Sequence, residues 1–214
     1  MPTSSITKIK TKRSNLYLRV AKGHFATNHS HSNYYIDVAA QKSRLSEAKA
    51  VSQELCGNRH YKVKIVDTIL CLDGTEVIGA CMAAELTREG YMNMNSHRTI
   101  YVVTPEHTSG SQLIFRDNTA PMIVGKHVLV LAASVATGYT AQAAIEAIRY
   151  YGGTPVGICS IFACVKECEG FQVQSLYKSE DIMNYQSHPS SSCPLCKAGV
   201  KIDALVNSHG ISSI

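Results

Sequence analysis

The chain has 214 residues, of which 45% are hydrophobic and 17% are charged, and its formal net charge is +5. This length and composition suit one globular α/β domain with a large core and exclude a disordered chain. The sequence lacks an apolar run of the ~18 residues that a membrane helix needs, and its N-terminus lacks the apolar core of a signal peptide. We therefore expect a cytoplasmic protein that binds no membrane.

The start of the chain is basic. Its lysines and arginines up to position 22 are Lys8, Lys10, Lys12, Arg13, Arg19 and Lys22. A basic arm could touch nucleic acid, but a modest net charge favours a solvated edge beside a phosphate-binding site. We expect no nucleic-acid partner.

Three histidines lie close together after the first strand-like stretch, residues 16–23 (LYLRVAKG). They are His24, His29 and His31, and they are followed by the segment SNYYID at 32–37. Clustered histidines suggest a metal site, but no cysteine or carboxylate stands at ligand spacing beside them. We therefore interpret them as surface histidines.

A helix and a strand follow. Residues 43–56 carry Leu45, Ala48, Val51 and Leu55 at helical spacing, which predicts a helix that covers the core. Residues 61–72 begin with strand alternation and end as a buried strand, and a sharp turn (DGT, 73–75) leads to a helix over 77–86.

The next segment predicts a strand and a projecting loop. Residues 99–103 read as a buried strand. Two short apolar runs, 113–115 and 122–124, then flank a polar turn at 116–118, which predicts a hairpin.

Residues 127–153 (HVLVLAASVATGYTAQAAIEAIRYYGG) predict a strand, a loop and a helix. Residues 128–131 form an unbroken apolar run, and Ala144, Ile145, Ile148 and Tyr151 fall on one helical face. The loop between them offers hydroxyls, a glycine and backbone N–H groups at a helix N-terminus, where an anion is favoured. The loop is therefore a predicted phosphate site.

This stretch resembles the phosphate-binding signature of the type I phosphoribosyltransferases, which is a hydrophobic strand, two acidic residues, a Thr-Gly-x-Thr loop and a helix. Thr137, Gly138 and Thr140 stand where that family binds the 5'-phosphate of phosphoribosyl pyrophosphate. The segment SNYYID resembles the N-terminal region of the orotate branch. The resemblance covers residues 32–177.

The resemblance implies roles for several residues. The phosphate-binding set is Ser134, Ala136, Thr137, Gly138, Tyr139 and Thr140. The loop that receives pyrophosphate in the family corresponds to Asp73, Gly74 and Thr75. The base pocket corresponds to Ser32, Tyr34 and Tyr35. Asp73 and Glu76 put negative charge at the pyrophosphate loop, and they hold a cation, mark a weakened site or belong to a plain turn.

Two features depart from the family. Ala132 and Ala133 replace the acidic pair that holds the ribose hydroxyls, and the mobile loop lacks the lysines and arginines of the orotate enzymes. His107 is the one candidate for a catalytic cation in that loop, against the alternative of a solvated loop histidine. In the family this loop closes over the site of the partner subunit, so we expect a homodimer, and a catalytic form would need Mg²⁺.

Four cysteines form two motifs near the C-terminus. CPLCKAG contains Cys193 and Cys196 at the spacing of a zinc knuckle, and CVKEC contains Cys164 and Cys168. The two motifs together predict a structural Zn²⁺ site. Reduced surface thiols and a redox pair remain the alternatives, and disulfides are not expected in such a chain.

The sequence as a whole predicts an α/β fold with a mostly parallel sheet and helices on both faces, as in type I phosphoribosyltransferases. A projecting hairpin loop and a Cys-rich C-terminal segment complete it. We expect a phosphoribosyltransferase-like domain at 1–186 and an extension at 187–214 packed on it. The expected ligand is phosphoribosyl pyrophosphate, a nucleoside monophosphate or ribose phosphate, bound with weak or no transferase activity. The alternative is an active enzyme that transfers phosphoribose to orotate or a related base.

Overall fold

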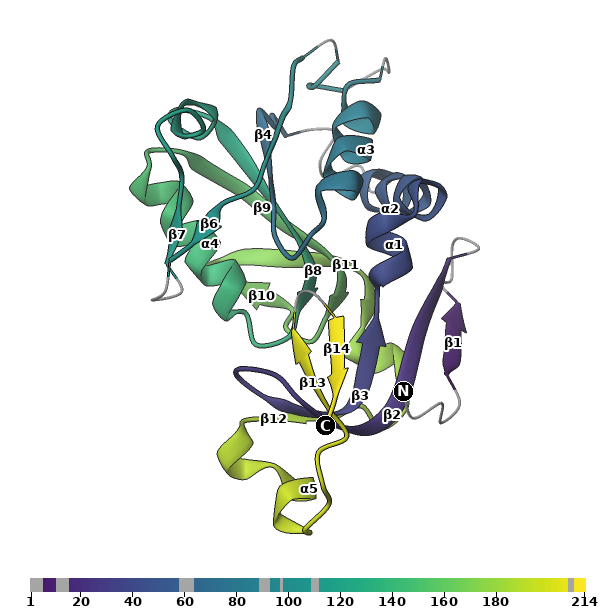
Figure 1. Cartoon of the computed structure of the whole chain (residues 1–214). Coiled ribbons are helices and arrows are strands. Elements are labelled where there is room, and N and C mark those ends of the chain that lie inside the picture. The colour runs from purple at the N-terminus through teal and green to yellow at the C-terminus, as the bar shows by residue number, and fades with distance from the viewer. Residues whose placement is uncertain are drawn as a thin grey trace.

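The main sheet of the protein has six strands in the order β10-β11-β9-β8-β4-β5. In the computed structural model, which describes residues 6–10, 16–57, 64–88, 93–96, 98–108, 112–207 and 210–214, neighbouring strands are parallel except β10 and β11. The strands are β4 (Thr68–Cys71), β5 (Tyr101–Val103), β8 (His127–Val135), β9 (Thr154–Ala163), β10 (Glu167–Cys168) and β11 (Phe171–Lys178). The predicted mostly parallel sheet is confirmed (Figure 1).

Helices cover both faces of this sheet because both faces are apolar. Leu129 and Leu131 of β8 point into one core, and Val128 and Val130 point into the other. The first core includes α2 (Leu45–Gly57) and α3 (Glu76–Leu86), and the second includes α4 (Tyr139–Tyr150). Alternate residues of a strand face opposite sides, so the unbroken apolar run in β8 is buried on both sides.

A second sheet joins the two ends of the chain, and it lies below the main sheet in Figure 1. Its order is β12-β3-β2-β13-β14, and β1 also pairs with β2. The strands are β1 (Thr7–Lys10), β2 (Tyr17–Ala26), β3 (His31–Asp37), β12 (Ser187–His188), β13 (Ala204–Asn207) and β14 (Gly210–Ser213). The C-terminal segment therefore completes a sheet that the N-terminal strands begin. The predicted boundary between 186 and 187 stays a prediction.

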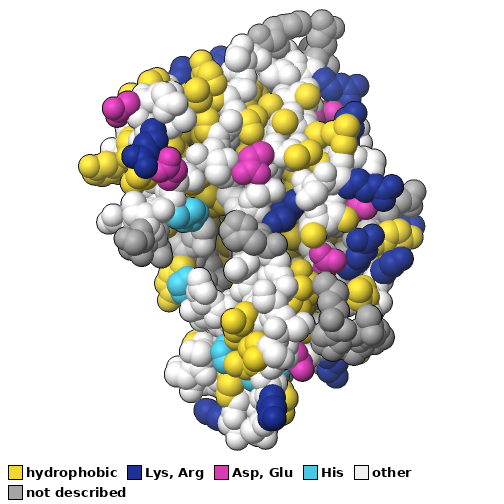
Figure 2. Space-filling view, in the orientation of Figure 1, with side chains coloured by type: hydrophobic (Ala, Val, Ile, Leu, Met, Phe, Trp, Pro, Cys, Tyr) yellow, Lys and Arg dark blue, Asp and Glu magenta, His cyan; other side chains and the backbone are white. Residues whose placement is uncertain are grey.

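Short helices connect these elements. They are α1 (Ala39–Ser43), α5 (Pro194–Lys197) and the 3₁₀ turns η1 (Ala120–Met122), η2 (Ser179–Asp181) and η3 (Ser190–Ser192). None of the helices in the described part of the chain is long and apolar enough to cross a membrane. Over α1 and α2 the lysine and arginine side chains alternate with acidic ones (Figure 2).

The projecting hairpin exists, but its predicted turn at 116–118 and its predicted second arm at 122–124 are wrong. Strand β6 (Glu106–His107) pairs with β7 (Leu113–Ile114), whereas the second apolar run falls on and after η1. Pro121 in η1 has no N–H to donate to a strand ladder, which explains the difference. The predicted buried strand at 99–103 is the edge strand β5, and Tyr101 on it is exposed.

Candidate functional site

The predicted phosphate loop connects β8 to α4 at the carboxyl end of the main sheet. Strand β8 runs to Val135, so Ser134 belongs to the strand and the loop proper is 136–138. Gly138 has φ 89°, a left-handed conformation that glycine adopts without steric cost, and it lets α4 begin at once with Tyr139. The loop is therefore as short and sharp as the sequence predicts.

Polar groups of this loop face solvent. Ser134, Thr137, Tyr139 and Thr140 are all exposed. The first backbone hydrogen bond of α4 runs from the N–H of Gln142 to the carbonyl of Gly138, so the three N–H groups before Gln142 stand at the open end of the helix. Hydroxyls and a helix N-terminus can together accept a phosphate there.

The two residues before Ser134 can make no such contact. Ala132 is 2% exposed and Ala133 is 5% exposed, and Ala132 is paired with Ser160 of β9. Their methyl groups offer neither a hydrogen-bond acceptor nor a metal ligand. The position of the family's acidic pair is thus filled by apolar side chains inside the sheet.

The predicted pyrophosphate loop lies beside the phosphate loop, because β4 and β8 are parallel neighbours. Asp73 and Gly74 both have left-handed backbones, with φ 58° and 75°. The hydroxyl of Thr75 is buried and donates to the carbonyls of Leu72 (2.8 Å) and Leu131 (3.2 Å). Thr75 therefore connects the end of β4 to the middle of β8 through its side chain.

Lys42 of α1 is a cation at this loop that the sequence analysis missed. Its Nζ donates a 2.6 Å hydrogen bond to the carbonyl of Asp73, and it lies next to Gly74. No motif marks a lysine 31 residues before the loop it contacts. A fixed positive charge here can neutralise a bound anion.

The three predicted base-pocket residues lie on β3 but do not share one face. The hydroxyl of Ser32 donates to the carbonyl of Tyr34, and the ring of Tyr34 stacks on Tyr185. The ring of Tyr35 instead packs against Phe25, because successive side chains of a strand point to opposite sides. Ser32 and Tyr34 can therefore line one pocket, whereas Tyr35 faces away from it. A base-binding role for any of them stays a prediction.

His107 lies on β6 and is exposed. Its neighbour Glu106 accepts hydrogen bonds from Arg116 at 2.9 and 2.6 Å, and these bonds lower the pKa of Glu106. An arginine therefore lies just after β7, but it is paired with Glu106. The tip of the hairpin, which includes Gly110, lies outside the described residues, and a catalytic role for His107 stays a prediction.

Two further side chains touch the phosphate loop. His29, at the turn between β2 and β3, packs its ring against that of Tyr139, with 5.4 Å between the ring centroids. The thiol of Cys168 lies 3.7 Å from the carbonyl of Gly138. The second sheet thus reaches the phosphate loop through the turn of its β2–β3 hairpin.

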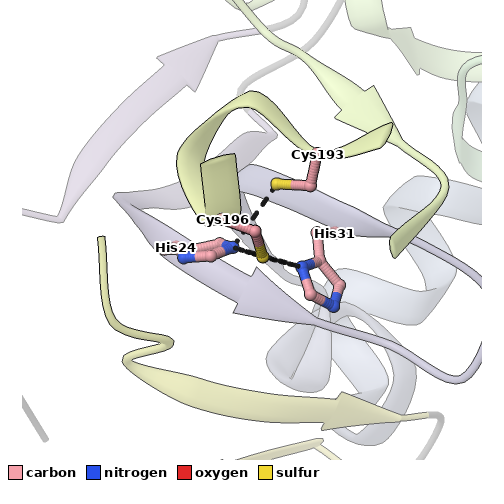
Figure 3. A group of neighbouring side chains, drawn as sticks. All are labelled: His24, His31, Cys193 and Cys196. Atoms are coloured by element: carbon pink, nitrogen blue, oxygen red, sulfur yellow. Dashed lines mark hydrogen bonds between the residues drawn. The ribbon is translucent and has the colours of Figure 1, made fainter. Parts of the chain in front are cut away.

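The predicted metal ligands must be corrected. Cys193 and Cys196 group with His24 and His31, and the ligand atoms of these four residues lie within 4.8 Å of one another (Figure 3). The CVKEC cysteines lie elsewhere: Cys168 is beside Gly138, and Cys164 is next to Tyr185. The interpretation of His24 as a surface histidine was also wrong, since it is 1% exposed, while His29 is exposed as expected.

The local structure explains how two sequence-distant segments meet. An irregularity in the β2–β3 register between Lys22 and Phe25 inserts an extra residue, and His24 lies within it. The ring Nδ1 of His24 is 2.9 Å from the carbonyl of Val200, just after the CPLC turn. The backbone N–H of His24 donates to the carboxylate of Asp203 at 2.7 Å. These contacts hold the C-terminal segment against the β2–β3 hairpin.

Comparisons with known proteins agree with this fold. No protein-family model matches the chain. In sequence it is 27% identical over 187 residues to an orotate phosphoribosyltransferase from Chlorobium phaeobacteroides, and the match covers 86% of each chain.

Solved structures give the same result. The chain is similar to a phosphoribosyltransferase from Corynebacterium diphtheriae, with a TM-score of 0.52, 18% identity, and coverage of 76% of this chain and 89% of that one. It is also similar to the adenine phosphoribosyltransferase of Thermoanaerobacter pseudethanolicus, with a TM-score of 0.51, 16% identity, and coverage of 81% and 95%. The chain therefore has the fold of the type I phosphoribosyltransferases, and the predicted resemblance is confirmed.

Proposed function

We propose that this protein binds a phosphoribosyl compound, with the 5'-phosphate on residues 134–140, and that its transferase activity is weak or absent. The ligand is phosphoribosyl pyrophosphate, a nucleoside monophosphate or ribose phosphate. One observation carries the proposal. Exposed hydroxyls and a helix N-terminus follow Val135, while the positions just before Ser134 hold two buried alanines.

Binding rests on groups that are present. Thr137 and Thr140 offer exposed hydroxyls, and charge-assisted hydrogen bonds to a phosphate contribute about 1.5–3 kcal/mol each. Lys42 adds a positive charge at the neighbouring loop of Asp73 and Gly74, where a pyrophosphate group would lie.

The expectation of weak catalysis rests on groups that are absent. In phosphoribosyl transfer the ribose carbon gains positive character as pyrophosphate leaves, so the ribose and the leaving group must be held rigidly. Each lost transition-state contact costs about 2.7–4 kcal/mol. Two such losses slow the reaction by roughly four to six orders of magnitude if they add.

Magnesium does not fit the alanine pair. Mg²⁺ needs oxygen ligands in near-octahedral geometry, and Ala132 and Ala133 supply none. No step of this proposal therefore runs through magnesium. Asp73 and Glu76 supply carboxylates at the pyrophosphate loop, and the hydroxyl of Thr104 donates to Glu76 at 3.1 Å.

The second candidate function is an active phosphoribosyltransferase that uses orotate or a related base in nucleotide biosynthesis, with Mg²⁺ and as a homodimer. The similarity to an orotate phosphoribosyltransferase over 86% of the chain favours it. Lys42 could then neutralise the departing pyrophosphate, and His107 would act from the hairpin.

Calorimetric titration with phosphoribosyl pyrophosphate, with and without Mg²⁺, and an assay of pyrophosphate release with orotate separate the two. We expect binding in both titrations and a turnover at least roughly four orders of magnitude below that of an orotate phosphoribosyltransferase measured in parallel. Turnover comparable to that enzyme would replace the first proposal with the second. An absence of binding would contradict both.

A further inference from the structure

We propose that His24, His31, Cys193 and Cys196 bind one structural zinc ion, which fastens the C-terminal segment to the β2–β3 hairpin. This inference is independent of the phosphoribosyl site. It concerns a different set of residues, in the second sheet and the turn around α5.

The first argument is geometric. Zinc bound tetrahedrally, with Zn–N of about 2.0–2.1 Å and Zn–S of about 2.3 Å, spaces its nitrogen ligands about 3.3 Å apart and its nitrogen and sulfur ligands about 3.5 Å apart. Nε2 of His24 lies 3.2 Å from Nδ1 of His31, 3.5 Å from Sγ of Cys193 and 3.6 Å from Sγ of Cys196. Nδ1 of His31 lies 3.2 Å from Sγ of Cys196. These four separations are close to the edges of such a tetrahedron.

The second argument is the orientation of His24. Its Nδ1 is 2.9 Å from the carbonyl of Val200 and 3.2 Å from that of Lys201, and a carbonyl can only accept. Nδ1 therefore carries a proton, and in the neutral ring this leaves a lone pair on Nε2, the atom that faces the two sulfurs. Zinc-bound histidines are oriented in this way by a hydrogen bond from the other ring nitrogen.

The third argument is the cost of burial. His24 is 1% exposed and Cys193 is 2% exposed, whereas Cys196 is exposed, and the ligand atoms of all four residues converge (Figure 3). Convergent lone pairs in a buried place are unfavourable without a cation between them. Zn²⁺ with two thiolates and two neutral imidazoles has no net charge, so it can lie against the buried side chains of His24 and Cys193.

The turn around α5 is built to present both thiols. Cys193 precedes Pro194, the first residue of α5, and Cys196 lies within the same helical turn. Gly199 then adopts φ 72°, and the N–H of Val200 returns to the carbonyl of Leu195 at 3.0 Å. This reversal carries the carbonyls of Val200 and Lys201 to His24.

The ligand chemistry selects zinc and a structural role. Two thiolates and two imidazoles in tetrahedral arrangement suit Zn²⁺. The protein fills all four positions, which leaves none for water or substrate, as in structural sites. A disulfide between Cys193 and Cys196 is the alternative, and it would leave both imidazoles without a metal ion to bind.

Metal analysis of the full chain, expressed in zinc-supplemented medium and purified without a polyhistidine tag, tests the proposal. We expect one zinc ion per chain. Less than about a tenth of an equivalent, or a Cys193–Cys196 disulfide in protein kept under reducing conditions, overturns it.

Zinc-edge X-ray absorption on the wild-type protein tests the ligand set without any mutation. Two nitrogens at about 2.0–2.1 Å and two sulfurs at about 2.3 Å are expected. A shell of four sulfurs would overturn the assignment and point to the two cysteine motifs together.

Matched variants identify the ligands by position. Cys193→Ser with Cys196→Ser, and His24→Gln with His31→Gln, should each reduce the zinc content to less than about a tenth. Cys164→Ser with Cys168→Ser removes the same number of thiols and should keep a full equivalent. Loss of zinc from this control alone would overturn the ligand set. If a ligand variant does not fold, the absorption spectrum of the wild type still decides.

Discussion

The phosphate loop and the His24/His31/Cys193/Cys196 group are two candidate sites that are built in opposite ways. The loop is a continuous segment, 134–140, at the end of one strand. The group joins His24 and His31 to Cys193 and Cys196, which lie 162 to 172 positions further along the chain. A continuous site depends on local backbone geometry, whereas a discontinuous one depends on how the segments pack and in turn holds them together.

This difference predicts separable behaviour. Loss of the metal should affect the stability of the molecule, because the ion connects strand β2 to the C-terminal segment. Loss of the loop hydroxyls should affect ligand binding and leave the stability nearly unchanged, because Thr137 and Thr140 are exposed. The following experiments test that separation.

The largest expected effect is on thermal stability. Removing zinc with a strong chelator should lower Tm by about 8–16 °C, because an ion present at about 1,000 times its Kd contributes about 4 kcal/mol and each kcal/mol shifts Tm by about 2–4 °C in a chain of this size. Differential scanning calorimetry measures the shift. The variant Cys193→Ser with Cys196→Ser should not respond to the chelator, and an equal response would show that the chelator acts elsewhere.

The second effect is on phosphate binding. Thr137→Val with Thr140→Val should weaken the binding of ribose 5-phosphate or a nucleoside monophosphate at least about tenfold, because two charge-assisted hydrogen bonds are lost. Titration calorimetry measures the affinity, and zinc content and Tm should stay the same. Thr154→Val, at the amino end of β9 and away from the phosphate loop, is the control. An unchanged affinity in the double variant means that the phosphate binds elsewhere.

The third effect distinguishes the pyrophosphate part of the ligand site from the part that binds the 5'-phosphate. Lys42→Met should weaken binding of phosphoribosyl pyrophosphate about tenfold and that of ribose 5-phosphate by less than about twofold, because Lys42 lies at the Asp73–Gly74 loop and not at the phosphate loop. Lys49→Met on the exposed side of α2 is the control. Equal weakening of both ligands would mean that Lys42 maintains the fold and contacts no pyrophosphate.

The smallest effect concerns the amino edge of the main sheet, away from the phosphate loop. The carboxylate of Asp67 accepts hydrogen bonds from the backbone N–H of His127 at 2.9 Å and from its ring at 2.8 Å, and Arg98 lies 3.3 Å away. Burial raises the pKa of Asp67, but the contacts with His127 and Arg98 outweigh burial and hold this pKa below its usual range.

A carboxyl group with a lowered folded pKa stabilises the fold above its unfolded pKa of about 3.9, and this contribution is lost as the pH falls through the folded value. Asp67→Asn should therefore reduce the free energy of unfolding by about 1 kcal/mol at pH 7, and the difference from wild type should shrink below about pH 4. Urea unfolding across this pH range measures it, and ligand affinity should not change. A difference that stays constant with pH would exclude the charged form as the cause.

Part of the fold and of the site could be predicted from the sequence because it is encoded locally. The apolar run at 128–131 and the spacing of Ala144, Ile145 and Ile148 each describe a short segment whose burial follows from its own pattern. The predicted strand pairing is wrong where a different segment of the chain forms the pair. Leu113 and Ile114 pair with β6 and not with the second apolar run, because Pro121 cannot join a ladder.

The sequence by itself determined the strand, loop and helix at 127–150, the replacement of the acidic pair by Ala132 and Ala133, and the turn that brings Cys193 and Cys196 together. Only the tertiary structure decided that their partners are His24 and His31, and that Lys42 reaches the carbonyl of Asp73. The physical reason is that periodicity and turn chemistry act over a few residues. Strand β2, in contrast, pairs with β1 along its first part and with β13 at its last residues. Which strands pair with β2 is decided by the packing of the whole chain.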